Sequence, residues 1–268
     1  MNLKNLQKFE YISGFLLKNE VSLNKAILVA RTISEAYYYL NYAVWNHGKN
    51  FRFSRNQPED TKDVGVVSLE GASKAIMVDL TITHPWSEQL RKHEKDPNDY
   101  GYADSYGALY LLSAEKGGET YTYGSRLREG VDQIDQAIKV LKQKPHSRQV
   151  SLTVSRPGDL SLPDPPCLRL VDFKIYEGSL TVTAFFRSWD IFGAANVNLI
   201  GLNDLQRYIA NEVGVKQGVL QVHSPNAHIY PSAYKLVEEW VTGKGKETES
   251  FAEKLGYKEK HLISMKEA

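Results

Sequence analysis

The chain has 268 residues, of which 33 are Lys or Arg and 32 are Asp or Glu, so its net charge is close to zero. This balance gives no support to broad electrostatic binding of nucleic acid or of an anionic membrane, and any bound anion must be held by a few placed residues. One cysteine excludes a disulfide framework and a CxxC-based zinc site, and no signal peptide or membrane-spanning apolar run is visible, so we expect a soluble, cytoplasmic protein without a metal site.

In the first part of the chain, residues 22–44 carry apolar side chains at helical spacing and predict one long helix. The polar, basic segment 48–65 predicts an exposed loop that contains Arg52 and Arg55. Strands are expected over residues 64–71 and 75–82, which are rich in β-branched side chains. A turn-rich stretch over 84–107 predicts a long loop, and loops of that length are often functional.

Residues 125–144 place Leu127, Val131, Ile134, Ile138 and Leu141 three or four positions apart, which predicts one amphipathic helix. A short strand over 148–154 and a proline-rich loop over 155–166 follow. Because proline cannot donate to a sheet ladder, the next strand should begin near Cys167.

Two strand-like runs, 167–176 and 179–188, flank Glu177-Gly178 and predict a tight hairpin. Pairing of the two arms would bring Cys167 beside Arg187, and a guanidinium beside a thiol lowers the pKa of that thiol. A lone cysteine is otherwise most often a small buried hydrophobe. Beyond the hairpin we expect a helix over 202–214, a strand and turn over 218–230, a helix over 232–240 and a charged, helical end over 247–268.

Three motifs occur in a fixed order: PDPPCLRL at 163–170, FFRSWDIFGAANVNL at 185–199 and NAHIY at 226–230. Together with YTYGSRL, DQIDQAI and SRQV upstream, they resemble the folate-dependent thymidylate synthases and the related pyrimidine-nucleotide hydroxymethylases, most closely the archaeal-type branch. The resemblance implies an α+β fold with a mixed β-sheet packed with helices, and a sheet-mediated homodimer. We expect one domain over 1–268, with 119–232 as the best-matched catalytic part and 1–118 as a divergent N-terminal part.

The resemblance implies that Cys167 is the nucleophile, which adds to C6 of a pyrimidine so that C5 can attack a one-carbon donor. It also implies that Arg187 activates the thiol and contacts the nucleotide phosphate, to which Ser188 would donate. Tyr123 matches a tyrosine near the proton that leaves C5. Asp190 would position the ring or an ordered water, with a simple turn aspartate as the alternative.

Asn198 matches the residue that reads the pyrimidine ring, with Asn196 as the alternative if the motif is shifted. A carboxamide both donates and accepts, so it suits O4 and N3–H of uracil. By the same resemblance His228 and Tyr230 would bind the sugar 3′-hydroxyl, and on a strand two residues apart share a face.

Arg148 matches an arginine that reaches across a two-fold axis to the partner's phosphate, which requires a homodimer with a shared active site. Gln149 stands where many members carry a second arginine, and Arg52 or Arg55 could supply the missing contact. Glu88 is the candidate for the proton-relay acid, with a solvated loop glutamate as the open alternative.

Leu168 follows the cysteine where most bacterial and eukaryotic members carry histidine, and this departure leaves the final chemical step open. The first interpretation is conversion of dUMP to dTMP with 5,10-methylenetetrahydrofolate. The second is 5-hydroxymethylation of dUMP, UMP, dCMP or CMP with the same donor and water as the last nucleophile. A non-catalytic nucleotide-binding homologue is the third.

Overall fold

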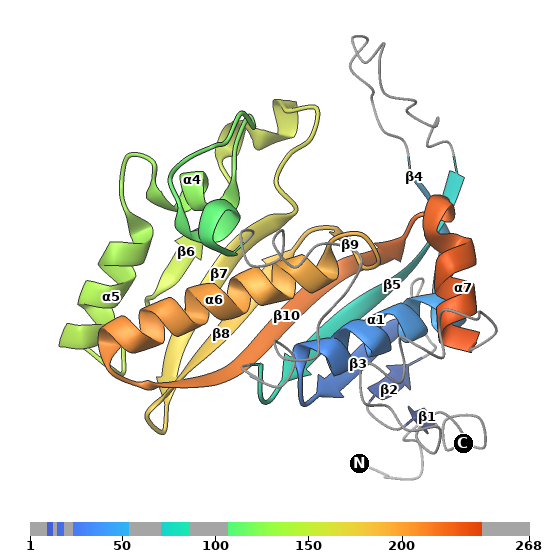
Figure 1. Cartoon of the computed structure of the whole chain (residues 1–268), viewed down its shortest axis with the longest axis horizontal. Coiled ribbons are helices and arrows are strands. Elements are labelled where there is room, and N and C mark those ends of the chain that lie inside the picture. The colour runs from blue at the N-terminus through green and yellow to red at the C-terminus, as the bar shows by residue number, and fades with distance from the viewer. Residues whose placement is uncertain (1–9, 13–14, 19–23, 54–70, 86–106, 243–268) are drawn as a thin grey trace, which may run out of the picture.

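A computed structural model describes residues 10–12, 15–18, 24–53, 71–85 and 107–242 of the chain. Within them a sheet of ten strands forms the centre, in the order β1-β2-β3-β5-β10-β8-β7-β6, with β4 on β5 and β9 on β10. Figure 1 shows helices α1 and α6 lying side by side across one face of this sheet. Helices therefore cover one face of a mixed sheet, and the predicted α+β fold is confirmed.

The strands of the sheet are β1 (Glu10–Ile12), β2 (Phe15–Lys18), β3 (Lys25–Ala30), β4 (Lys49–Phe53), β5 (Gly71–Ile82), β6 (Ser151–Thr153), β7 (Leu168–Tyr176), β8 (Ser179–Phe186), β9 (Trp189–Asp190) and β10 (Lys216–Ile229). The helices are α1 (Ile33–His47), α4 (Tyr123–Arg128), α5 (Gln133–Gln143), α6 (Ala195–Val213) and α7 (Tyr234–Thr242). Short helical turns also occur at Gly107–Leu112, Pro157–Ser161 and Pro231–Ala233.

The prediction of one helix over 22–44 is wrong in its first half. Residues Lys25–Ala30 form β3, which pairs in parallel with β5, and α1 starts only after the N-cap Thr32. The alternation in β3 is hidden in the sequence because its outer face is also apolar, with Ile27 and Val29 exposed by 42% and 51%. An apolar run without polar alternation does not distinguish a strand from a helix.

The segment predicted as a loop over 48–65 begins with a strand, because Lys49–Phe53 pair with β5. The remainder of that segment lies outside the described residues. So do residues 64–70 of the strand predicted over 64–71 and residues 86–106 of the loop predicted over 84–107. The strand predicted over 75–82 is confirmed as the larger part of β5.

The single helix predicted over 125–144 is instead two helices, α4 and α5. Each has its own N-cap: the Thr122 hydroxyl accepts from the Ser125 N–H at 2.9 Å, and the Asp132 carboxylate accepts from the Asp135 N–H at 2.9 Å. Gly130 lies between them with φ of 81°, a left-handed conformation that ends a helix. Val131 is therefore 54% exposed and does not join the buried stripe.

The predicted hairpin is confirmed, with β7 and β8 joined by Glu177-Gly178. Both turn residues have positive φ, 49° and 73°, as a type I′ turn requires. Strand β7 begins at Leu168, next to Cys167 as predicted.

The helix predicted over 202–214 is longer than expected, because α6 starts at Ala195, before the predicted start at residue 202. Its N-cap, Ala194, makes no side-chain hydrogen bond, so the sequence carries no capping signal there. Helix α7 covers most of the helix predicted over 232–240, and residues 247–268 lie outside the described part of the chain.

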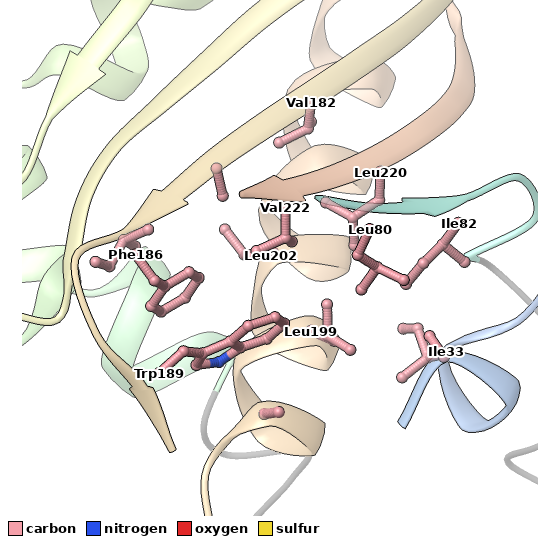
Figure 2. Close-up of a cluster of buried hydrophobic side chains, with 14 of the residues drawn as sticks. Ile33, Leu80, Ile82, Val182, Phe186, Trp189, Leu199, Leu202, Leu220 and Val222 are labelled. Carbon is pink, nitrogen blue, oxygen red and sulfur yellow. The ribbon is translucent and has the colours of Figure 1, made fainter. Parts of the chain in front are cut away.

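The core lies between the sheet and the two helices that cover it (Figure 2). It is formed by inward-facing side chains of the central strands together with the apolar stripes of α1 and α6, including Leu80, Ile82, Val182, Phe186, Leu220, Val222, Leu199, Leu202 and Ile33. Among the described residues, no helix is long and apolar enough to cross a membrane.

Candidate active site

The predicted site residues gather where β8 and β10 end. These strands are parallel, so their carboxyl ends meet at the same edge of the sheet. Strand β9 follows β8 directly and pairs with the end of β10, where Asp190 lies opposite His228. The topology thus brings Arg187, Ser188, Asp190 and His228 together.

Cys167 and Arg187 lie opposite each other at the open end of the hairpin. The Arg187 backbone N–H donates to the Cys167 carbonyl at 2.9 Å. The guanidinium of Arg187 donates from Nε to the Pro166 carbonyl at 3.0 Å and from Nη2 to the Pro165 carbonyl at 2.6 Å. These bonds fix both the cation and the two residues that precede the half-buried thiol.

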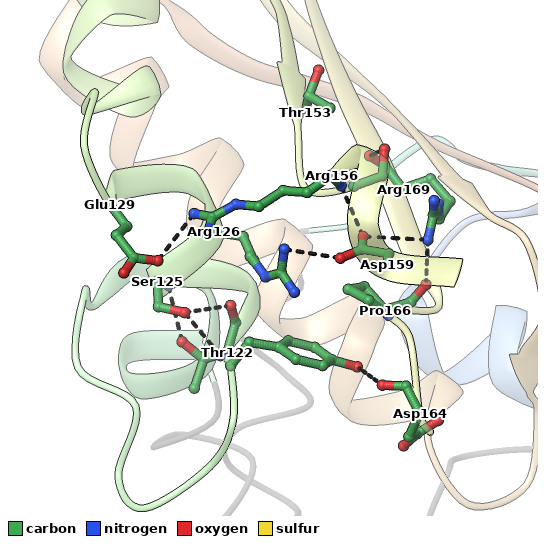
Figure 3. Close-up of polar contacts among 12 residues, drawn as sticks. Thr122, Ser125, Arg126, Glu129, Thr153, Arg156, Asp159, Asp164, Pro166 and Arg169 are labelled. Atoms are coloured by element: carbon green, nitrogen blue, oxygen red, sulfur yellow. Dashed lines mark hydrogen bonds and ion pairs between the residues drawn. The ribbon is translucent and has the colours of Figure 1, made fainter. Parts of the chain in front are cut away.

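A second group of charges supports the loop that leads to Cys167 (Figure 3). The Asp159 carboxylate, 2% exposed, forms ion pairs with Arg126 at 3.0 Å and Arg169 at 3.6 Å, and it accepts from the Arg156 N–H at 2.8 Å. Arg169 also donates to the Pro166 carbonyl at 3.3 Å. Asp159 is therefore connected to the cysteine loop through a shared arginine, a role that no sequence pattern indicated.

Tyr121 is another residue that the sequence interpretation missed, although it belongs to the YTYG motif. Its hydroxyl donates to the Asp164 carbonyl at 3.0 Å, and the Arg126 guanidinium lies 5.0 Å from its ring centroid. Burial, followed by the nearby charge of Asp164, raises the pKa of Tyr121 well above its usual value, so the hydroxyl stays protonated. Tyr123 is buried and packs edge-on against Tyr110, with ring centroids 5.2 Å apart.

Asp190 is the last residue of β9, directly before the tight turn that leads to α6. Burial raises the pKa of its carboxyl, while the Gly193 N–H, which donates to Oδ1 at 3.0 Å, and the nearby His228 oppose that rise. A Cβ on Gly193 would lie 2.5 Å from Asp190 Oδ2, so any other residue at this position would require the carboxylate to move.

His228 is 6% exposed, and burial lowers the pKa of its imidazole, which favours the neutral ring. Nδ1 lies 3.3 Å from the Asn226 carbonyl and 3.5 Å from Ser188 Oγ, and the ring packs edge-on against Tyr230 with centroids 4.7 Å apart. Nε2 is buried and meets no hydrogen-bond partner among the described residues. A neutral ring that donates from Nδ1 to the carbonyl presents Nε2 as an acceptor, which suits a ligand hydroxyl.

Asn198 lies in the first turns of α6 and is 5% exposed. Its Oδ1 accepts a hydrogen bond from the indole Nε1–H of Trp189 at 3.1 Å. Asn196, the alternative ring-reading residue, is half-buried two positions earlier.

The remaining predicted residues are placed less completely. The side chain of Arg148 is exposed, just before β6. Arg52 lies in β4, where its backbone pairs with Ala72 of β5. Two residues further along β5, Lys74 pairs with Ile229 at the end of β10. Arg55 and Glu88 lie outside the described residues.

Comparisons with known proteins agree on one family. The family model described as thymidylate synthase matches residues 68–263 of the chain. A protein described as "Putative thymidylate synthase" from Methanosarcina acetivorans is 35% identical over 224 residues, which cover 81% of this chain and 95% of that protein. One of the same description from Methanothermobacter thermautotrophicus is 47% identical over 134 residues, which cover 49% of this chain and 60% of that relative.

The fold has a counterpart among solved structures. The crystal structure of thymidylate synthase from T4 phage superimposes with a TM-score of 0.56, 18% identity and coverage of 76% of this chain and 79% of that one. The family model spans more than half of the chain, and the Methanosarcina relative is matched along nearly its whole length. The chain therefore belongs to the thymidylate synthase family, a family of one-carbon transferase enzymes.

Proposed function

We propose that this protein methylates C5 of a uridine monophosphate, most simply dUMP to dTMP, with 5,10-methylenetetrahydrofolate as the one-carbon donor. The observation that carries the proposal is the pairing of Cys167 with Arg187, whose guanidinium is fixed by the carbonyls of the two residues before the thiol. A cation held beside a thiol favours the thiolate, which is the nucleophilic form.

In the proposed reaction the Cys167 thiolate adds to C6, and the C5=C6 electrons move to the C4 oxygen. C5 then forms a bond with the methylene carbon of the donor, while the bond from that carbon to one folate nitrogen breaks. Loss of the C5 proton and cleavage of the bond to the second nitrogen leave an exocyclic methylene group on the ring. Hydride transfer from the tetrahydrofolate to the exocyclic carbon and departure of the thiolate from C6 give the methyl product and dihydrofolate. The side chains contribute a nucleophile, fixed charges and positioning, while the donor supplies the carbon and the hydride.

Phosphate binding is proposed for Arg187 and Ser188. A guanidinium carries five N–H donors, and the two carbonyl bonds of Arg187 leave further donors for a phosphate oxygen. Ser188 is half-buried at the same strand end, beside His228. Arg52 and Arg55 complete this part of the proposal as additional phosphate contacts.

Recognition of the nucleoside is proposed for Asn198 at the base and for His228 with Tyr230 at the sugar. The support for the sugar site is the buried Nε2 of His228, an acceptor in the tautomer that donates to the Asn226 carbonyl. Proton movement at the ring is proposed for Tyr123, Asp190 and Glu88. The hydroxyl of Tyr121, near Cys167 and Arg187, is a further candidate for proton movement at the ring.

The proposal includes a homodimer in which Arg148 completes the partner's site, and a cytoplasmic location. The support for the dimer is the exposed side chain of Arg148 and the outer face of the sheet, which no described helix covers. Ile27, Val29 and Leu170 are exposed on that face, an apolar surface suited to a two-fold interface.

Leu168 is the observation that favours a second candidate, 5-hydroxymethylation. It is fully buried and apolar where most bacterial and eukaryotic members carry histidine next to the nucleophile. In that reaction water, instead of hydride, adds to the exocyclic carbon. The mass of the reaction product distinguishes methylation from hydroxymethylation.

The test is tritium release from [5-³H]dUMP with methylenetetrahydrofolate, followed by the mass of the product. Gain of a methyl group supports the synthase, and gain of a hydroxymethyl group supports the second candidate. Cys167→Ser should abolish release and largely spare nucleotide binding. If no uridine or cytidine monophosphate, deoxy or ribo, releases tritium, both enzymatic functions are refuted and a nucleotide-binding role remains.

A further inference from the structure

Side chains hold the backbone of residues 164–166, which we call the proline segment and which leads directly to Cys167. Its first carbonyl accepts a hydrogen bond from the Tyr121 hydroxyl at 3.0 Å, and its second accepts from Arg187 Nη2 at 2.6 Å. The third carbonyl accepts from Arg187 Nε at 3.0 Å and from Arg169 Nη1 at 3.3 Å. Because the last two residues are prolines and have no N–H, these side chains take the place of a sheet ladder.

Arg187 is shared between the proline segment and the proposed phosphate site. A phosphate oxygen competes with the carbonyls for the N–H donors of the guanidinium, so the hold of Arg187 on the segment depends on the bound nucleotide. Tyr121 and Arg169 take no part in the proposed phosphate site. Their hydrogen bonds to the segment are therefore independent of the nucleotide.

Tyr121 is itself held in place by its surroundings. The Arg126 guanidinium lies 5.0 Å from the ring centroid, within the range of a cation–π interaction, and it pairs with the buried carboxylate of Asp159 at 3.0 Å (Figure 3). Thr122, the next residue, is the N-cap of α4 and fixes the adjacent backbone. Because burial raises the pKa of Tyr121, its hydroxyl remains a donor well above neutral pH.

We propose that Tyr121 is a positioning residue that keeps the proline segment, and with it the Cys167 thiol, beside Arg187 while Arg187 binds the nucleotide phosphate. The inference rests on the proposed function, in which Cys167 is the nucleophile. Without the Tyr121 hydroxyl the segment loses an anchor that the nucleotide does not disturb. A thiol that moves away from a cation forms the thiolate less readily.

The test uses the only cysteine of the chain, since alkylation by iodoacetamide then reports the Cys167 thiol alone. The alkylation rate is measured against pH, with and without excess inorganic phosphate, which occupies the donors of Arg187. With phosphate, Tyr121→Phe should react about fivefold more slowly than wild type near neutral pH, as expected for the loss of one hydrogen bond. Its midpoint should shift toward the value of about 8.5 of a free cysteine, and the difference should shrink without phosphate. The substitution leaves in place the other ionisable groups that interact with Tyr121: Asp164, Tyr110, Cys167 and Arg187.

Two further variants distinguish a lost hydrogen bond from disturbed packing. Tyr176→Phe is the matched control, because Tyr176 is 62% exposed at the far end of the same hairpin, and it should react like the wild type. Replacement of Tyr121 by 4-aminophenylalanine keeps an N–H donor on the ring and should restore the alkylation rate. If this variant reacts as slowly as Tyr121→Phe, the slow reaction comes from packing and the inference is overturned.

The same measurements separate the inference from the proposed function. If Tyr121→Phe and wild type share one midpoint in phosphate, the inference is refuted, and a loss of tritium release alone would then assign Tyr121 to proton movement at the ring. If the alkylation rates change as expected but the wild type releases no tritium from any pyrimidine nucleotide, the proposed function fails while the positioning of the thiol stands.

Discussion

Burial controls the charge of the two ionisable side chains that meet at the end of β10. It raises the pKa of Asp190 and lowers the pKa of His228, so that each is shifted toward its neutral form. The charge of each side chain would favour the charged form of the other, but burial has the larger effect on both pKa values. The site thus offers a neutral imidazole near neutral pH, able to donate from one nitrogen and accept at the other.

We predict that His228 titrates below its usual value of 6.5. As the pH falls through 6.5, the unfolded chain binds a proton before the folded protein does, so the His228 contribution to the free energy of unfolding decreases toward acidic pH. Titration of the imidazole C–H resonances by NMR, with His228→Gln to assign the signal, measures the midpoint. A midpoint at or above 6.5 would contradict the prediction.

We predict that Asp159→Asn destabilises the protein by about 3 kcal/mol, because it leaves the buried guanidinium of Arg126 without its partner charge. Tritium release from dUMP should fall as well, since Asp159 also supports Arg169 at the cysteine loop. Urea denaturation measures the loss of stability, and the tritium-release assay measures the loss of activity.

The control for Asp159 is Glu129→Gln, which removes the exposed ion pair with Arg156. Exposed pairs contribute little to stability, so its denaturation midpoint should stay close to that of the wild type. Equal losses in the two variants would show that burial of the Asp159 pair does not matter.

The turn between β9 and α6 is held in place by hydrogen bonds to other elements of the fold. The Asp190 carbonyl accepts from the Ala194 N–H at 3.2 Å, the Ile191 N–H donates to the His228 carbonyl at 2.8 Å, and the Tyr37 hydroxyl of α1 donates to the Phe192 carbonyl at 2.7 Å. The turn is thereby tied to both β10 and α1, which fixes the start of α6 and Asn198 within it.

Gly193→Ala tests this turn, because the added Cβ would displace the Asp190 carboxylate. We expect kcat/KM for tritium release to fall by about tenfold or more, with a smaller effect on the thermal midpoint, since a small misplacement in a site costs much rate. Gly158→Ala is the matched control, because nothing lies within 4 Å of the corresponding Cβ. If both variants keep wild-type activity, the turn does not require the glycine.

Elements whose burial follows a clean alternation were predicted well. The inward residues of β8 alternate with partly exposed ones, and its turn to β7 needs only two residues, so the hairpin is a local property of the sequence. Strand β3 has apolar residues on both faces, and its identity as a strand depends on the pairing with β5.

At the scale of the whole molecule, the main feature is the face of the sheet that no helix of the described residues covers. His223 and Asp79 pair there, with Lys25 on the other carboxylate oxygen, and Phe185 stacks on His223 with centroids 5.5 Å apart. Burial alone would raise the pKa of Asp79, but the hydrogen bonds from Lys25 and His223 outweigh it and lower that pKa. This face therefore combines apolar side chains with a satisfied charge cluster, as a partner surface requires.

Mixing of inactive variants tests the shared site. Arg148→Ala and Cys167→Ser should each be inactive alone, but subunit exchange should restore about a quarter of the wild-type activity, because each mixed dimer keeps one intact site. A mixture of Cys167→Ser with His228→Gln is the control. Each of these changes damages the site of its own subunit, so a mixed dimer has one defect in each site and no intact site. No recovery in the first mixture, or a monomer by light scattering, would refute the shared site.

The hairpin, the juxtaposition of Cys167 with Arg187 and the family motifs could all be predicted from the sequence, because alternation, turn length and motif order are properties of neighbouring residues. Three features became visible only in the tertiary structure: residues 25–30 form a strand, Asp159 pairs with Arg126, and the Trp189 indole donates to Asn198. The physical reason is that burial and hydrogen bonding at these positions depend on partners that other elements of the fold supply.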